Sequence, residues 1–378
     1  MRGPLLLSSE VIGSASLLLE QYLSGAMSSE EIRQSVVVRM QRFLGIERPM
    51  VPLTQPAVAL SIALQLAGIG SADEVVAPTM AKASALMALS GGRVRLTLVD
   101  SDTLSWNMSE VALQRLIDER HQEGKPLPRA LVLCHNYGMP SHVDALLGLA
   151  RIHGMIVIEE ASDALGSSYG GHPCGSLGDY AIVGLSPFSG EWQDRGVLLV
   201  CPNESRAGRA RELAERTFRE GEFVLRRSYE CSSLLSGEEV FWTEVSLAYN
   251  LEVVSRARDN QHYLRELLAP AMGVRLLSPP SEDYRSNGVY SPVLIDSSLL
   301  NFSAQELQLA LVAQGIEAQP MRHPLHKMAV FSGVPLYGTG VADQYFSMGL
   351  VLPTGAHLSH NEVREMAEFI RNFIIRFN

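Results

Sequence analysis

The sequence predicts an α/β protein with a large domain, built on a seven-stranded and mostly parallel sheet, and a smaller C-terminal α+β domain. The chain has 378 residues, of which 46% are hydrophobic and only 19% are charged, so it can bury the cores of two domains. Short apolar runs bounded by turn residues recur along its first half, and helical stretches separate most of them. Strands that alternate with helices typically form a parallel sheet covered on both faces.

The elements follow one another in a regular order. Ser28 and Glu31 offer a capping box ahead of an amphipathic helix. Apolar runs then predict seven strands, at residues 50–54, 74–78, 94–100, 130–135, 155–160, 180–185 and 196–201. Helices are predicted between most of them, at 58–70, 83–91, 109–122 and 143–154. Beyond residue 201 the pattern becomes helical, and a long helix near 243–268 is expected to join the two domains, residues 1–245 and 246–378.

Charge and hydropathy exclude several classes of protein. A net charge of -10 and a pI near 5.5 argue against a nucleic-acid partner, because neutralising phosphates requires clustered lysine and arginine. No segment holds eighteen apolar residues, and Glu10 interrupts the apolar start, so a membrane partner and secretion are disfavoured and a cytoplasmic location is expected. The four cysteines lack CxxC spacing and are predicted to be buried thiols, with no metal site: Cys134, Cys174, Cys201 and Cys231.

A ligand is expected at the carboxyl ends of the predicted strands, where ligands of parallel sheets bind. The candidate loops follow Thr54, Pro78, Cys134, Glu160 and Leu185. Lysine is scarce, since only three of the 31 basic residues are lysines, namely Lys82, Lys125 and Lys327.

Residues 158–187, IEEASDALGSSYGGHPCGSLGDYAIVGLSP, resemble a segment of the DegT/DnrJ/EryC1/StrS family of sugar aminotransferases. Other blocks of that family are matched in order at 59–79, 135–154, 322–331 and 350–370. The resemblance implies a fold type I aminotransferase fold and a homodimer with active sites at the subunit interface. It also implies binding of pyridoxal phosphate (PLP) and a nucleotide-linked keto sugar. Because fold does not carry function, each site position needs its own examination.

The position of the family's Schiff-base lysine aligns with Ser189, and the next thirty residues contain no lysine. A serine hydroxyl cannot form an imine, and without a neighbouring base it is a poor proton acceptor. The resemblance therefore identifies a divergent member in which the cofactor lysine has been lost.

The positions that would hold the cofactor phosphate also depart from the family. Its SGT turn is replaced by Gln55, Pro56 and Ala57, and the proline removes one backbone N–H donor. Gly184 replaces a phosphate-binding serine and Ser186 a histidine. An asparagine that crosses the family's dimer interface aligns with Glu239, whose carboxylate would repel a phosphate.

Three positions around the family's pyridine ring carry charged side chains. Lys82 stands where an aromatic residue stacks on the ring, either as a salt-bridged residue at a helix start or as a relocated amine that binds phosphate or forms a displaced Schiff base. Glu160 replaces the aspartate that protonates the ring nitrogen, and Asp163 replaces the residue that contacts the ring hydroxyl. Glu160 and Asp163 are candidates for acid–base catalysis, with a purely structural role as the alternative.

The segment RHPLHK supplies candidate substrate-binding residues, Arg322, His323 and His326. The histidine spacing is explained by the family's PLH segment rather than by a metal site, and cationic side chains near a strand end suit a diphosphate. Earlier in the chain, residues 135–138 follow the family's HLYG, and Gly138 is expected to adopt positive φ in a turn.

Three functions remain open from the sequence. The first is a PLP-free pseudoenzyme that binds a sugar nucleotide or acts as a partner subunit in nucleotide-sugar or polysaccharide biosynthesis, as a homodimer or beside an active paralogue. The second is a cofactor-independent enzyme that uses Glu160, Asp163 or Lys82. The third is an aminotransferase or dehydratase that still uses PLP or its amine form (PMP).

Overall fold

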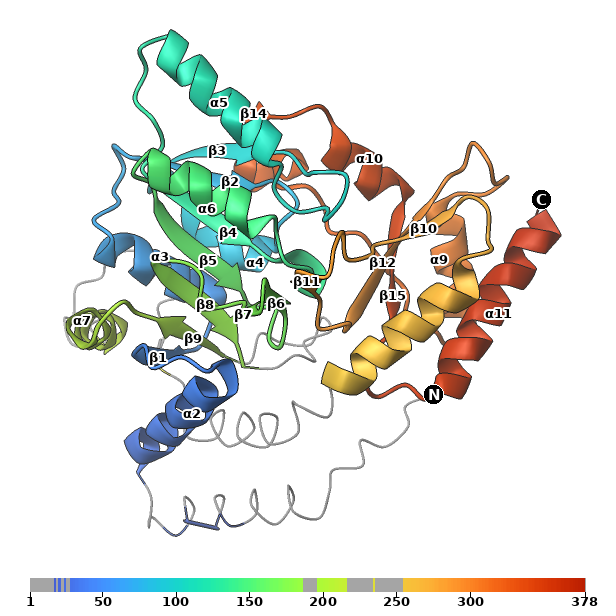
Figure 1. Ribbon diagram of the computed structural model, residues 1–378, viewed down its shortest axis with the longest axis horizontal. Helices are drawn as coiled ribbons and strands as arrows, with labels where there is room; N and C mark the ends of the chain where they lie inside the picture. The colour runs from blue at the N-terminus through green and yellow to red at the C-terminus, as the bar shows by residue number, and fades with distance from the viewer. Residues whose placement is uncertain are drawn as a thin grey trace.

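The computed structural model describes residues 28–185, 196–215 and 254–377, together with a few isolated positions (Leu17, Glu20, Gln21, Ser24 and Leu234). Its largest element is an eight-stranded sheet in the order β1-β9-β8-β5-β4-β2-β3-β14 (Figure 1). Seven of these strands are those predicted: β1 (Met50–Leu53), β2 (Glu74–Pro78), β3 (Arg95–Val99), β4 (Ala130–Cys134), β5 (Ile156–Ala161), β8 (Tyr180–Gly184) and β9 (Val197–Val200). Neighbouring strands pair in parallel, except that β9 is antiparallel to both β1 and β8.

The eighth strand, β14 (Leu336–Tyr337), comes from the C-terminal part of the chain and pairs in parallel with β3. The carboxylate of Asp100, just after β3, accepts backbone hydrogen bonds from Thr339, Gly340, Val341 and Ala342. The sequence did not predict this strand, because two residues are too few to show an alternating pattern.

Helices cover both faces of the sheet, as the alternation of elements predicts. The helices are α2 (Ser29–Leu44), α3 (Pro56–Leu66), α4 (Ala83–Leu86), α5 (Glu110–Gln122), α6 (Val143–Ile152) and α7 (Glu204–Glu215). Successive side chains of β2 point to opposite faces, so Val75 belongs to the core under α3 and α7, while Val76 belongs to the core under α5 and α6. The predicted capping box of Ser28 and Glu31 is confirmed at the start of α2.

The smaller part is built on a four-stranded antiparallel sheet in the order β10-β12-β15-β13. These strands are β10 (Val274–Leu276), β12 (Tyr290–Ile295), β15 (Gly349–Pro353) and β13 (Gln319–Pro320). Helical residues 254–268, α9 (Ala304–Ala313) and α11 (His360–Phe377) share its core, and α10 (Val341–Met348) precedes β15. The domain boundary predicted at 245/246 and the first half of the predicted 243–268 helix lie outside the described residues.

A third, small sheet connects the two parts. Its central strand β6 (Ser168–Tyr169) pairs with β7 (His172–Pro173) and with β11 (Tyr284–Arg285) of the smaller part. Within the described ranges, no helix is both long and apolar enough to cross a bilayer. Three of the predicted buried thiols are confirmed, at Cys134, Cys174 and Cys201, whereas Cys231 lies outside those ranges.

Candidate functional site

The chemically distinctive side chains gather at the carboxyl ends of β2, β4 and β5, the edge of the sheet that the sequence predicts. Lys82 follows β2 and forms the N-terminal boundary of α4, Tyr137 follows β4, and Asp163 follows β5. Arg322 reaches the same edge from the loop after β13. Residues far apart in the sequence therefore meet at one place.

Lys82, Asp163 and Arg322 form a group, here called the ion cluster, in which the carboxylate is buried and the two cationic side chains are 16% and 21% exposed. Nζ of Lys82 lies 3.4 Å from Oδ1 of Asp163, and Nη2 of Arg322 binds Oδ2 of the same carboxylate. The Asp163 side chain is only 2% exposed. Burial alone would raise the pKa of Asp163, but the charges of Arg322 and Lys82 outweigh burial and lower that pKa to about 2. Asp163 is therefore ionised throughout the neutral range.

Glu160 lies in the same environment with the opposite tendency. Its Oε1 accepts a hydrogen bond of 3.1 Å from the backbone N–H of Ser162. Burial and the nearby charge of Asp163 raise the pKa of Glu160. The pKa values of the two candidate acid–base residues thus shift in opposite directions, because Asp163, and not Glu160, forms ion pairs with Lys82 and Arg322.

Arg322 is held by more than its ion pair. Its guanidinium lies 4.5 Å from the centre of the Tyr137 ring, and its backbone N–H donates a hydrogen bond of 2.9 Å to the Tyr137 hydroxyl. Tyr137 has φ of 56°, a conformation that costs energy for a residue with a side chain. The sequence did not reveal this role of Tyr137, because nothing local distinguishes it from an ordinary core tyrosine.

The predicted turn at Gly138 is confirmed, with φ of 74°. A Cβ atom there would lie 2.1 Å from Oδ1 of Asn287, so the position also lacks space for a side chain. Asn287 in turn donates to the carbonyl oxygens of Asp163 and Leu165. Gly138 thereby allows the smaller part to pack directly on the loop that carries Asp163.

The two candidate histidines differ in their contacts. His326 lies between Thr79 and Asp343, with its Nδ1 2.7 Å from Oγ1 of Thr79 and its Nε2 3.0 Å from Oδ1 of Asp343. His323 is exposed, and the centre of its ring lies 4.7 Å from the centre of the Phe346 ring. With both ring nitrogens bonded, His326 fixes the loop that carries Arg322 to the end of β2, whereas His323 remains accessible.

We expect Thr79→Val to destabilise the protein by about 1–3 kcal/mol, because a buried hydroxyl is lost and Nδ1 of His326 loses its partner. Chemical denaturation measures the change. Thr103→Val is the control, since Thr103 is exposed. Equal unfolding free energies for the two variants would contradict this role of Thr79.

The predicted phosphate positions are only partly described. Gln55 is exposed and precedes α3 without a side-chain capping bond, Pro56 is the first residue of that helix, and Ala57 is buried. A Cβ atom on Gly184 would lie 2.2 Å from the carbonyl oxygen of Ser162, so a serine cannot be placed there without a backbone shift. Ser186, Ser189 and Glu239 lie outside the described residues.

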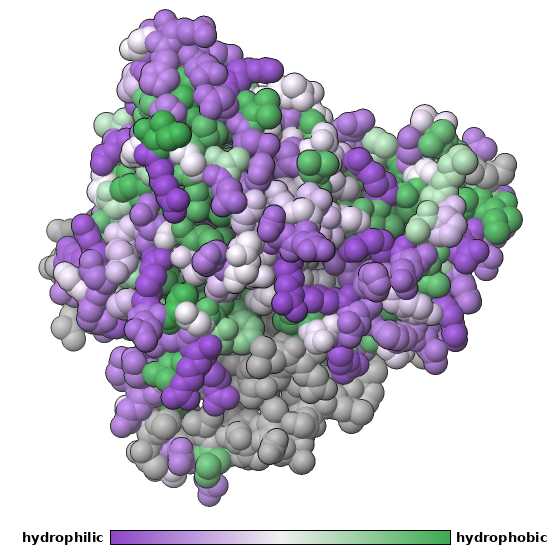
Figure 2. Space-filling model, viewed as in Figure 1, coloured by the Kyte–Doolittle hydropathy of each residue, from purple (hydrophilic) through white to green (hydrophobic). Residues whose placement is uncertain are grey.

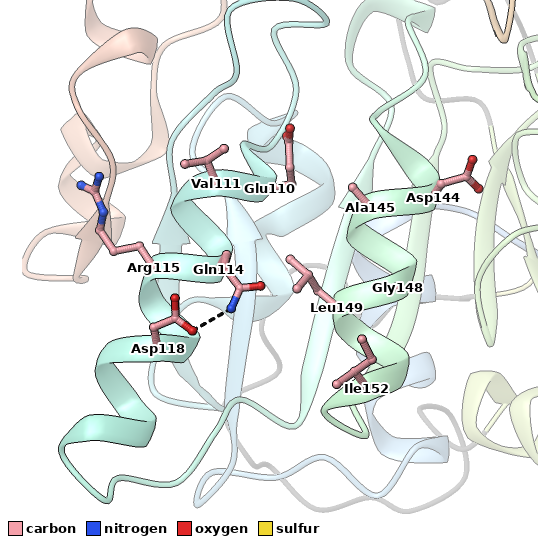
Figure 3. A pocket seen from close by; sticks show the side chains of 10 residues that line it. All are labelled: Glu110, Val111, Gln114, Arg115, Asp118, Asp144, Ala145, Gly148, Leu149 and Ile152. Carbon is pink, nitrogen blue, oxygen red and sulfur yellow. Dashed lines mark hydrogen bonds between the residues drawn. The ribbon is translucent and has the colours of Figure 1, made fainter.

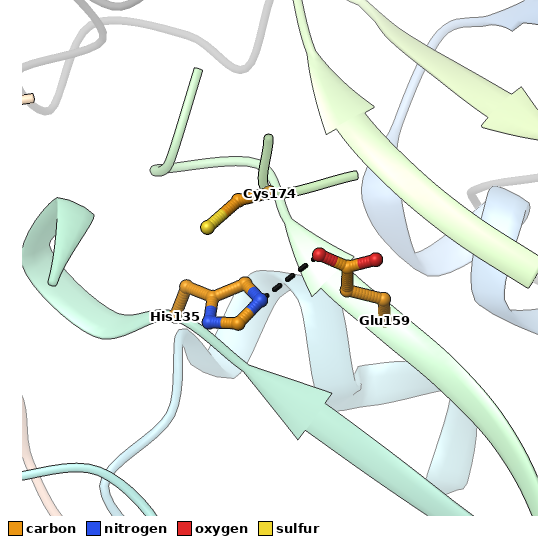
Figure 4. A group of neighbouring side chains, drawn as sticks. All are labelled: His135, Glu159 and Cys174. Carbon is orange, nitrogen blue, oxygen red and sulfur yellow. Dashed lines mark hydrogen bonds and ion pairs between the residues drawn. The ribbon is translucent and has the colours of Figure 1, made fainter. Parts of the chain in front are cut away.

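A second buried cluster consists of His135, Glu159 and Cys174, whose potential ligand atoms lie within 4.8 Å of one another (Figure 4). The two oxygens of Glu159 already accept four hydrogen bonds, from Nε2 of His135 and from the backbone N–H groups of Gly175, Leu177 and Gly178. Nδ1 of His135 accepts from the backbone N–H of Ser141. These hydrogen bonds occupy the oxygens of Glu159 and the ring nitrogens of His135 that would otherwise bind a metal. The cluster therefore fits a structural role, here called a clasp because it ties separate chain segments together, better than a metal site.

A surface groove of about 670 Å³ lies between α5 and α6, away from the ion cluster (Figure 3). Exposed apolar residues such as Val111 and Ile152 line it, and apolar residues gather over these helices at the upper left of Figure 2. No residue of the groove belongs to the strand ends, so we do not assign the chemistry to it.

The family model of the DegT/DnrJ/EryC1/StrS aminotransferases matches residues 34–371. The chain belongs to this family. EpsN of Bacillus subtilis is 27% identical over 321 residues, covering 82% of this chain and 80% of its own. GDP-perosamine synthase of Caulobacter vibrioides is 26% identical over 311 residues, covering 81% and 80% of the two chains.

Solved structures share the fold over nearly the whole chain. A family member from Brucella abortus has a TM-score of 0.82 at 19% identity and covers 97% of this chain and 95% of its own. DesI, solved in the presence of its TDP-sugar product, has a TM-score of 0.81 at 22% identity, with coverage of 99% and 92%. The predicted fold type I aminotransferase fold is thus confirmed.

The three lysines of the chain differ in exposure and in the carboxylates they pair with. Lys125 follows α5, is 54% exposed and pairs with Glu123. Lys327 is 42% exposed and pairs with Asp343. Only Lys82 places its amine in the ion cluster, so a lysine-bound cofactor at the site would have to use Lys82.

Proposed function

We propose that this family member does not hold PLP as a Schiff base and instead binds a nucleotide-linked sugar at the ion cluster, as a pseudoenzyme or partner subunit. The observation that carries the proposal is the buried ion pair of Lys82 with Asp163. A lysine must lose its proton to attack an aldehyde, and the neighbouring carboxylate favours the protonated amine. The ion pair with Asp163 therefore works against the neutral amine that this attack requires.

The geometry of the ion cluster also fits the cofactor poorly. The resemblance places Lys82 on the face of the pyridine ring and Asp163 beside the ring hydroxyl. In the structure these two side chains pair with each other, with 3.4 Å between their charged atoms. Pro56 leaves one N–H donor fewer at the start of α3, and Glu160 is pushed toward the neutral acid. We therefore derive no reaction step through PLP.

The relatives support a sugar nucleotide as the ligand. One is named GDP-perosamine synthase, and DesI was solved in the presence of a TDP-sugar product. We propose a role in cytoplasmic nucleotide-sugar or polysaccharide biosynthesis, as a homodimer or in a heterodimer with an active paralogue. Arg322 and the exposed His323 are the proposed contacts to the ligand.

A second candidate function is an enzyme that reacts with a nucleotide-linked keto sugar. One observation favours it: Glu160, Asp163 and Lys82 interact electrostatically within one buried group. A carboxyl group whose pKa is raised by burial, beside an amine, is suited to proton transfer. Turnover of a keto sugar, with or without PLP or PMP, would distinguish this enzyme from a binding protein.

The first experiment incubates the full chain with excess PLP, followed by desalting, absorption spectroscopy, borohydride reduction and intact-mass measurement. We expect no stable band near about 410–430 nm and no adduct on Lys82. Lys82→Met is the matched control, because an adduct that persists in it is nonspecific. In parallel, we expect at least one of UDP-, dTDP- and GDP-glucose to raise the melting temperature.

An adduct in the wild type that is lost in Lys82→Met would overturn the cofactor-free proposal. The absence of stabilisation by any of the three sugar nucleotides would overturn the proposed ligand class.

A further inference from the structure

In the described part of the chain, three of the buried polar atoms that have no hydrogen-bond partner lie in the loops after β4, β5 and β13. They are Nη1 of Arg322, Nδ2 of Asn136 and Oγ of Ser162. Asn136 and Ser162 directly precede Tyr137 and Asp163 in the chain. A buried donor without a partner costs about 1–3 kcal/mol, so such atoms are rare in native proteins unless a ligand or water satisfies them. All three can donate a hydrogen bond, which indicates a ligand rich in acceptors.

The charges of the site point in the same direction. Lys82 and Arg322 are two cations that share one firmly ionised carboxylate, Asp163. Burial and the charge of Asp163 raise the pKa of Glu160, the other acidic group among them. The two cations therefore share a single ion-pairing carboxylate. Cations that are incompletely paired favour a ligand of opposite charge over a neutral one.

The unpartnered nitrogen belongs to a side chain that is already fixed in position. Arg322 is bound by Asp163 through Nη2, by the face of the Tyr137 ring, and by the Tyr137 hydroxyl through its backbone N–H. A planar guanidinium presents several donors in a rigid arrangement that matches carboxylate and phosphate oxygens. Because little side-chain freedom remains to be lost, binding through Nη1 avoids much of the usual entropy cost.

We propose that the ligand binds through an oxyanion, a carboxylate or a phosphate group, that accepts a hydrogen bond from Nη1 of Arg322. The proposal rests on the proposed function and narrows it, since an oxyanion forms a stronger hydrogen bond with a guanidinium N–H than a neutral hydroxyl group does. The oxyanion belongs either to an acidic sugar or to the phosphate that links the sugar to its nucleotide.

The test measures thermal unfolding of the full chain at constant ionic strength with four separate probes: glucose, glucuronate, glucose 1-phosphate and inorganic phosphate. We expect the melting temperature to rise with anionic probes and not with glucose. In Arg322→Lys, which keeps the charge beside Asp163 but removes the guanidinium fork, the apparent Kd should increase about tenfold or more. Lys327→Gln removes a cation from the same loop and should bind like the wild type, because that lysine pairs with Asp343.

A second variant tests the proposal in the opposite direction, by an expected gain in anion binding rather than a loss. Asp163→Asn removes the carboxylate of the ion cluster, so an anionic probe should raise its melting temperature more than that of the wild type. Stabilisation by glucuronate alone assigns the oxyanion to an acidic sugar, and stabilisation by the two phosphate probes alone assigns it to the phosphate link.

The proposal is overturned if glucose stabilises as well as the anions do, if none of the four probes stabilises, or if Arg322→Lys and Lys327→Gln bind the anions equally. Its failure is distinguishable from that of the proposed function. A PLP adduct on Lys82 would contradict the cofactor-free proposal and yet leave arginine-dependent anion binding intact.

Discussion

Replacing Asp163 with asparagine should lower the free energy of unfolding by about 3–5 kcal/mol at neutral pH. The substitution keeps the size of the side chain but deprives the partly exposed cations of Lys82 and Arg322 of the buried anion they share, and removing one partner of a buried pair has this typical cost. Urea denaturation followed by circular dichroism measures the change. Asp118→Asn is the matched control, because Asp118 is exposed on α5.

The same variant should change how stability depends on pH. The folded pKa of Asp163 is about 2, below the ordinary value of 3.8. A lowered folded pKa contributes stability that is fully present above about pH 4 and is lost as the pH falls toward 2. The stability difference between wild type and Asp163→Asn should therefore narrow over that interval. A constant difference, or a variant as stable as Asp118→Asn, would contradict the ion cluster.

Replacing Glu159 with glutamine should destabilise the protein by about 3 kcal/mol or more. The carboxylate accepts four hydrogen bonds inside the core, and an amide would direct a donor toward some of those same donors. Each unsatisfied buried group costs about 1–3 kcal/mol. Glu123→Gln, at a 52% exposed site, is the matched control for chemical denaturation.

The Glu159 variant also tests the alternative of a metal site. If the clasp of His135, Glu159 and Cys174 is structural, added Zn²⁺ should not raise the melting temperature of the wild type. Stoichiometric zinc in the purified wild type that is lost in Glu159→Gln would show that the cluster binds metal instead.

The fold could be predicted because its signals are local. The capping box at Ser28 and the seven apolar runs each depend on residues close together in the chain, and alternation of strands with helices then limits the topology. Strand β14 escaped prediction because its two residues are ordered by pairing with β3 and by the Asp100 carboxylate. Both partners are more than two hundred residues away.

The sequence indicated where the residues of the ion cluster would lie, but not how their side chains contact one another. Strand ends correctly indicated where Lys82, Glu160 and Asp163 would lie, and the family resemblance singled out Arg322. Arg322 and Lys82 share the carboxylate of Asp163, although they lie 159 and 81 residues from it in the chain. No pattern in the sequence indicates contacts between residues so far apart. The same reason hid Thr79 and Asp343, which together occupy both nitrogens of His326.

The smaller part is attached to the large part at two separate places, through β14 on β3 of the large sheet and through β11 on β6 of the small third sheet. A hinge motion that swung the smaller part away would have to break backbone pairing at both attachments. Rigid-body opening on a large scale is therefore energetically unfavourable. The loop that carries Arg322 is expected to stay beside the strand ends. Ligand exchange at the ion cluster should accordingly proceed by local rearrangement of side chains and loops, so free and bound forms should superimpose closely over both parts.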